Sequence, residues 1–248
     1  MTIGADSALH RIQEAIDAIA DTAYSHQRTF IVEVMGRNCG YLTLIAAITS
    51  EADVAFIPES PPESGWQDRM FDKLKAEREH GQRLNLILVG EGAKDRQGKS
   101  ITADAVRKLI IDKFPDQHVS DARVTVLGHV QRGGSPSAFD RILGCRMGAE
   151  GILALKDFWD KPEAEASVAS LVRNQEVRVN LIKSVAQTKA VGTAMKSRNF
   201  DEAVEIRGST FQRNLSAYKM LSQISPPPAG SDHSGGFRIL ILCIGSPG

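Results

Sequence analysis

Apolar positions along this chain form short continuous runs that alternate with segments of helical spacing. TFIVEV (29–34) and LNLILVG (84–90) are almost uninterrupted apolar runs, whereas the apolar residues between positions 9 and 19 recur every three or four residues. Strand and helix patterns alternate four times before about residue 158. Continuous apolar strands separated by helices are typical of a parallel sheet covered on both faces. The pattern therefore predicts an α/β fold with Rossmann-like layers.

The approximate limits of the elements follow from the same pattern and from capping and turn residues. Asp6 or Ser7 can cap the first helix, which ends near Tyr24, and Pro58 closes the second strand. The four predicted strands lie in TFIVEV, ADVAFIPE, LNLILVG and VTVLG. The predicted helices lie around residues 7–24, 40–52, 66–74, 103–114 and 138–155.

The alternation of strand and helix patterns ends near residue 159. Residues 159–224 contain VNLIKSVAQTKAVGTAMKSR and FDEAVEIRGSTFQRNLSAYKMLSQI, which we interpret as two helices completing the preceding unit of residues 1–158. Residues 225–236 have the Pro, Gly and Ser content of a flexible linker. FRILILCIGSPG (237–248) then reads as one strand and a glycine turn, which suggests the opening of a second, truncated α/β unit.

Composition narrows the class of protein. The chain has 248 residues, of which 42% are hydrophobic and 24% charged, and its 30 basic residues balance 30 acidic ones. We therefore expect a globular protein without the net positive charge that would attract nucleic acid or an anionic membrane. The longest apolar runs are far short of the roughly 20 residues of a membrane span, and no secretory signal is evident. Three cysteines without a C-x-x-C pair argue against zinc or disulfides and favour a cytoplasmic protein.

Glycine-flanked polar residues follow three of the predicted strands. They are MGR (35–37), GEG (90–92) and GHVQRGG (128–134). Each motif alone is weak, because glycine ends many strands. In a parallel sheet, however, the carboxyl ends of the strands share one edge, where ligands bind. We therefore expect these three loops to form one site.

The residue types in these loops suit a phosphorylated polyol. Arg37 offers a planar fork of donors for phosphate, Glu91 can accept hydrogen bonds from sugar hydroxyls, and His129 and Arg132 can reach one phosphate together. Less specific interpretations remain open: a surface salt bridge for Arg37, a solvated charge for Glu91 and a structural histidine for His129. Without a nucleophile, a metal cluster or a complete phosphate-binding loop, the set indicates binding rather than chemistry.

Two further arginines lie at the opposite end of the same strands. Arg28 precedes the strand TFIVEV and Arg123 begins the strand before VLG. Within one subunit they cannot join the loop site. They would take part in it only if a second subunit brought them across an interface, and otherwise they are exposed surface arginines.

Several long motifs give the chain a family resemblance. TIGADSALHRIQEAIDAIADTAYSHQRTFIVEVMGRNCGYLTLIAAI, VGEGA and ARVTVLGHVQRGGSPSAFDRILGCRMG closely resemble the 6-phosphofructokinases in their longer, two-half eukaryotic form. The resemblance is specific from Thr2 to about Leu155, is looser through SLVRNQEVRVNLIKSV, and extends to the end of the chain. It implies the layered phosphofructokinase fold, here incomplete and followed by a helical segment and a linker.

The resemblance also implies residue roles. Met35, Gly36 and Arg37 match the family motif that contacts fructose 6-phosphate, with Arg37 near the transferred phosphoryl group. Glu91 matches the residue that holds the sugar hydroxyls. The remaining matches are the 6-phosphate motif, with His129, Gln131 and Arg132, and the arginines that reach a neighbouring subunit's site, Arg28 and Arg123.

The activity implied is transfer of phosphate from ATP, with Mg2+, to fructose 6-phosphate in glycolysis by an oligomeric, allosteric, cytoplasmic enzyme. The family's T-I-D-N-D base and its glycine-rich nucleotide and magnesium loops would precede Thr2, so no metal ligand is assigned in this chain. We therefore expect this piece alone to have little or no kinase activity and an exposed, aggregation-prone sheet edge. Alternatives are a non-catalytic sugar-phosphate-binding or regulatory subunit and, more weakly, a pyrophosphate-dependent phosphofructokinase.

Overall fold

The computed structural model describes residues 2–23, 28–82, 84–114, 121–161, 165–172 and 174–223. The predicted linker 225–236 and the predicted strand 237–248 lie outside these residues. The helices are α1 (Ala5–Ala23), α2 (Tyr41–Thr49), α3 (Trp66–Glu79), α4 (Ala103–Lys113), α5 (Ala138–Asp160), α6 (Leu181–Lys196), α7 (Phe200–Arg207), α8 (Ser209–Leu221) and the short 3-10 helix η2 (Gly128–Arg132). The strands are β1 (Thr29–Val34), β2 (Val54–Phe56), β3 (Asn85–Gly90), β4 (Ala122–Val126), β5 (Ser167–Val172) and β6 (Gln175–Asn180).

The predicted parallel sheet is confirmed. Its strands have the order β2-β3-β1-β4, and each of the three pairings is parallel. β1 and β3 occupy the centre and are buried on both faces, which explains their uninterrupted apolar sequences. β4 is an edge strand of the described sheet, and its Val126 is 59% exposed. The exposed, aggregation-prone edge expected from the sequence stays a prediction.

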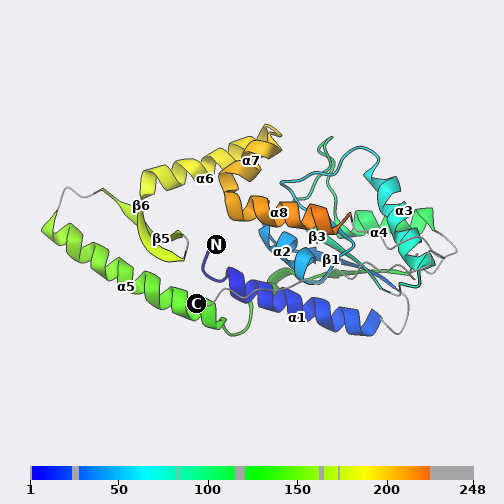
Figure 1. Cartoon of the computed structure of the whole chain (residues 1–248), viewed down its shortest axis with the longest axis horizontal. Coiled ribbons are helices and arrows are strands. Elements are labelled where there is room, and N and C mark those ends of the chain that lie inside the picture. The colour runs from blue at the N-terminus through cyan, green and yellow to red at the C-terminus, as the bar shows by residue number, and fades with distance from the viewer. Residues whose placement is uncertain are drawn as a thin grey trace, which may run out of the picture.

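Helices cover both faces of this sheet (Figure 1). On one face, Ile31 and Ile87 pack with apolar residues of α3 and α4. On the other face, Val32 and Leu88 pack with residues of α1 and α2. A third cluster, which includes Phe211 of α8, seats α8 against α2, so part of the helical segment is an integral layer of the fold.

The amino end of α1 is capped differently from the sequence expectation. The helix begins at Ala5, so Asp6 and Ser7 lie inside its first turn. The carboxylate of Asp140, in the first turn of α5, accepts hydrogen bonds from the N–H groups of Gly4 and Ser7, each at 2.8 Å. Ser137 caps α5 and donates to Asp6 at 2.6 Å. The two helix starts therefore stabilise each other across more than 130 residues of sequence.

The sequence had suggested a purely helical segment for residues 159–224, and that prediction is wrong. β5 and β6 form an antiparallel hairpin between α5 and α6, separate from the main sheet. The second predicted helix of this segment is also broken, because Gly208 has φ +92° and separates α7 from α8. The residues of the hairpin are exposed or half-buried and half of them are polar, so no continuous apolar run marks either strand in the sequence. None of the helices in the described ranges combines the length and apolar character that crossing a bilayer requires.

Glu77 of α3 gives this fold a testable pH dependence. Its side chain is buried, accepts a hydrogen bond from Asn85 Nδ2 at 2.8 Å, and lies 3.8 Å from Lys73 Nζ. Burial first, and then the charge of Asp53, raise the pKa of Glu77 to about 7. Because the folded state keeps this proton to higher pH than the unfolded chain, the free energy of unfolding should fall as pH rises from about 4.5 to about 7. The loss should be on the order of 3 kcal/mol.

Thermal unfolding across this pH range checks the prediction. Glu77→Gln keeps an oxygen that can accept from Asn85 but cannot ionise, so its stability should depend less on pH and exceed that of the unsubstituted protein at pH 8. Glu79→Gln, an exposed change on the same helix, is the control and should leave the slope unchanged. Equal slopes for the Glu77→Gln variant and the unsubstituted protein would contradict the prediction.

Candidate functional site

The three glycine-flanked loops meet at one edge of the sheet, as predicted. Val34, the last residue of β1, is paired with Gly90, the last residue of β3. The N–H of Glu91 donates to the carbonyl of Val34 at 2.9 Å, and the N–H of Leu127 donates to the carbonyl of Glu33 at 3.1 Å. The motifs after β1, β3 and β4 are therefore in register at the carboxyl ends of three adjacent strands.

Gln131 attaches the third loop to the first. Its side-chain oxygen accepts from the N–H of Met35 at 2.7 Å, and its Nε2 donates to the carbonyl of Met35 at 3.1 Å. The side chain is only 3% exposed. Both polar atoms of the Gln131 amide therefore bind the backbone of Met35, so this side chain positions the loop after β1. Substrate binding by Gln131 itself, expected from the family motif, stays a prediction.

Glu91 holds the turn after β1 from the second loop. Its Oε2 accepts from the N–H of Gly36 at 3.0 Å and from the N–H of Arg37 at 2.8 Å. These hydrogen bonds, first from Arg37 and then from Gly36, lower the pKa of Glu91, and the charges of Arg37 and Arg132 lower it further. The carboxylate is therefore ionised and oriented, and among the described residues its other oxygen has no hydrogen-bond donor, so it can accept from hydroxyl groups.

The turn itself has an unusual backbone. Arg37 and Asn38 have φ +38° and +63°, in the left-handed region that costs non-glycine residues energy. A Cβ atom on Gly36 would lie 2.4 Å from the carbonyl oxygen of Cys39, and one on Gly92 would lie 2.4 Å from Asn38 Oδ1. The turn is therefore closely packed around its two glycine neighbours, and the hydrogen bonds to Glu91 help to offset its strain.

Three basic side chains face solvent at this edge. Arg37, His129 and Arg132 are exposed, and η2 carries the latter two. Within the described residues, no ion pair or side-chain hydrogen bond engages the Arg37 guanidinium, so the structure gives no sign of the surface salt bridge considered for it. The edge thus combines two arginines, a histidine and an oriented carboxylate, an arrangement that can bind a phosphate and neighbouring hydroxyls.

Arg28 and Arg123 lie at the other end of the strands, also as predicted. Thr29 is paired with Ala122 at the amino ends of β1 and β4. Arg28 Nε donates to Asp121 Oδ2 at 2.7 Å, and Arg123 Nε lies 2.9 Å from Asp121 Oδ1. One carboxylate therefore gathers both guanidinium groups into a single cationic cluster. Six residues of strand, about 20 Å, separate it from the loop site of the same chain.

Two residues next to the site were missed from the sequence. The fully buried Glu59 accepts from the N–H of Gly40, and Arg207 of α7 pairs with the carboxylate of Glu59. The two residues are 148 positions apart, so no local motif could have joined them. The only available sequence signal was a glutamate directly after an apolar strand.

A metal ion does not fit the described residues. Within the described ranges, no group of three or more His, Cys, Asp or Glu side chains could hold one. A divalent cation prefers several oxygen ligands, and the lone Glu91 is already bonded to two N–H groups. No chemical step is therefore assigned to a metal or nucleotide held by these residues.

The fold and the loop edge define an α/β protein with a candidate anion-binding site at the carboxyl ends of parallel strands. A family model described as phosphofructokinase matches residues 1–155, which is more than half of the chain. The chain therefore belongs to the phosphofructokinase family, and the resemblance stated from its motifs is confirmed.

Individual relatives agree with this assignment. The chain is 55% identical to an ATP-dependent 6-phosphofructokinase of Schistosoma mansoni over 248 residues, all of this chain and 31% of the relative. It is 51% identical to the human liver-type enzyme of the same description, again over the whole chain and 30% of the relative. The solved phosphofructokinase of Saccharomyces cerevisiae superimposes with a TM-score of 0.83 at 41% identity, covering 90% of this chain and 28% of that one. The chain thus spans under a third of these relatives.

Proposed function

We propose that this chain supplies the sugar-phosphate site of an ATP-dependent 6-phosphofructokinase, which converts fructose 6-phosphate to fructose 1,6-bisphosphate. The observation that carries the proposal is the meeting of Arg37, Glu91, His129 and Arg132 at one sheet edge. The relatives described as ATP-dependent favour ATP over pyrophosphate as the phosphate donor. In this proposal residues 1–158 form the sugar-phosphate part of the unit and residues 159–224 complete it.

Each residue has a physical role in this proposal. His129 and Arg132 bind the 6-phosphate by charge-assisted hydrogen bonds, while the ionised Glu91 accepts hydrogen bonds from sugar hydroxyls. Arg37 stabilises negative charge that develops on the transferred phosphoryl group. In the complete enzyme, ATP with Mg2+ held outside the described residues would supply that group. Met35 and Gly36 bring their backbone against the sugar phosphate, and Gln131 fixes their position.

The cationic cluster at the far end of the strands fits an oligomer. We propose that Arg28 and Arg123 bind the sugar phosphate held by a neighbouring subunit, with the surrounding phosphofructokinase subunits as partners. Asp121 keeps the two guanidinium groups together. A polyanionic substrate attracts both, because the cluster of two cations and one anion keeps a net positive charge. Allosteric control of such an oligomer, a role in glycolysis and a cytoplasmic location belong to the same proposal.

Activity of the full-length polypeptide encoded by the gene tests the proposed function. With fructose 6-phosphate and ATP in an aldolase-coupled assay, we expect turnover that depends on both substrates. The chain of 248 residues alone should bind fructose 6-phosphate weakly and turn over little. Intact mass of the native polypeptide identifies which of the two species the cell contains. Absence of both turnover and sugar-phosphate binding in the full-length polypeptide would contradict the proposal.

A further inference from the structure

The turn of residues 35–40 is held from four directions, and one of these comes from the helical segment. Gln131 holds the residue at its start, and Glu91 holds the next two N–H groups. The remaining contacts involve Arg207, the last residue of α7. Arg207 Nη2 donates a hydrogen bond, 3.1 Å long, to the carbonyl of Asn38, the residue directly after Arg37.

Glu59 holds the end of the same turn. Its two carboxylate oxygens accept from the N–H of Gly40 at 3.0 and 2.9 Å. A Cβ atom on Gly40 would lie 2.6 Å from Glu59 Oε2 and 2.6 Å from Ile57 Cβ, so the turn reaches this carboxylate only because residue 40 has no side chain. The contact is therefore specific in shape as well as in charge.

Arg207 and Glu59 form a nearly dry ion pair. The Glu59 side chain is 0% exposed and that of Arg207 is 20% exposed, with Nε 2.6 Å from Oε1. The guanidinium also lies over the ring of Phe211, 5.8 Å from its centroid, which fixes its direction. Removing either partner leaves a charge buried without its counterion, so the pair is costly to break.

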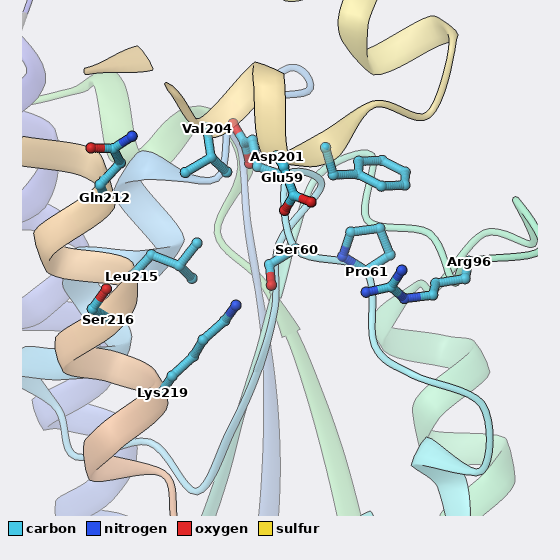
Figure 2. Close-up of a pocket in the computed structure, with 11 residues that line it drawn as sticks. Glu59, Ser60, Pro61, Arg96, Asp201, Val204, Gln212, Leu215, Ser216 and Lys219 are labelled. Atoms are coloured by element: carbon cyan, nitrogen blue, oxygen red, sulfur yellow. The ribbon is translucent and has the colours of Figure 1, made fainter. Parts of the chain in front are cut away.

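The ion pair lies beside helices α7 and α8 of the helical segment. Glu59 and Ser60 of the loop after β2 line a pocket of about 230 Å3 together with Val204, Leu215 and Lys219 of α7 and α8. Figure 2 shows these side chains around the pocket. α8 is attached to α2 by the apolar cluster around Phe211. The end of α7 is attached to the turn by Arg207.

We propose that Arg207 and Glu59 are positioning residues that hold the 35–40 turn in the conformation presenting Arg37 to substrate. This inference rests on the proposed function, because it takes the turn to be the sugar-phosphate turn. Neither residue touches substrate itself. Through this pair, the position of α7 sets the position of Arg37, and the helical segment becomes part of the substrate site.

Steady-state kinetics of the full-length polypeptide give the functional test. Arg207→Met should lower kcat/KM for fructose 6-phosphate about 10-fold or more, because small misplacement of a catalytic group is costly. KM for ATP should be unchanged, a split that a general loss of structure would not produce. Arg207→Lys keeps the charge but cannot reach Glu59 and Asn38 with one planar fork, so it should restore activity only in part. Where Arg207→Met fails to fold, Arg207→Lys carries the test.

A double-substitution cycle tests whether the two residues act as one unit. Glu59→Gln keeps an oxygen for the Gly40 N–H but loses the charge. If the pair acts together, Glu59→Gln combined with Arg207→Met should be no worse than Arg207→Met alone. Arg213→Met, an exposed arginine on α8, is the matched control and should be silent. Additive losses, or equal changes in KM for both substrates, would overturn the proposal.

Amide hydrogen exchange separates this inference from the proposed function. Exchange at residues 38–40 should accelerate in Arg207→Met whether or not the polypeptide is a kinase, while exchange in β1 and β3 stays slow. If the unsubstituted polypeptide had no kinase activity, the proposed function would be rejected. The exchange result would still decide whether the Arg207–Glu59 pair holds the turn. Unchanged exchange at 38–40 would overturn the positioning role.

Discussion

Arg37→Met is expected to lower kcat of the full-length polypeptide by about 100- to 1,000-fold, the usual cost of removing a donor that stabilises developing charge. The structure places this guanidinium at the carboxyl end of a central strand, exposed, on a turn whose N–H groups are bonded to Glu91. Methionine preserves much of the side-chain length and cannot form charge-assisted hydrogen bonds. Steady-state assays with saturating fructose 6-phosphate and ATP measure the effect.

Two comparisons make this result specific. Arg213→Met removes an exposed arginine remote from the turn and should leave kcat within a factor of two or so, as surface substitutions usually do. The thermal midpoint of the Arg37→Met variant should equal that of the unsubstituted protein or exceed it, because the exposed side chain forms no ion pair with the described residues and the backbone bonds to Glu91 remain. A change in kcat below about 5-fold would exclude the proposed role of Arg37 in charge stabilisation.

Leu88→Ala is expected to destabilise the fold by about 2–5 kcal/mol. Leu88 is 0% exposed, lies on a central strand, and is paired with Val32 on one side and Ala55 on the other. Its side chain packs in the cluster that joins the sheet to α1 and α2. Truncation removes buried methyl groups and leaves a cavity that these rigid elements cannot close.

Denaturant or thermal unfolding measures this effect, with a loss of roughly 5–15 °C in the midpoint. The matched control is Leu153→Ala on α5, a residue that is 53% exposed and should change stability by about 0.5 kcal/mol or less. Similar losses for the two leucines would show that the central sheet does not limit the stability of the protein.

Much of the fold was readable from the sequence, and the reasons are physical. The strands β1 and β3 are buried on both faces, so their sequences are apolar throughout and stand out from their surroundings. Carboxyl ends of parallel strands share an edge, so the parallel sheet expected from the sequence already placed Met35, Glu91 and Gln131 at one edge. The hairpin of β5 and β6 was missed because half of its residues are polar and none is fully buried, so neither strand forms a continuous apolar run.

The sequence by itself determined the parallel α/β fold, the edge that carries the candidate site and the family of the chain. Each of these follows from short apolar runs and local sequence motifs. Only the tertiary structure decided which groups hold the site in place. Glu59 and Arg207, like Asp140 and the first turn of α1, are joined by folding across more than 130 residues. A pairwise contact at that distance leaves no periodic trace in the sequence, since it depends on where two rigid elements pack.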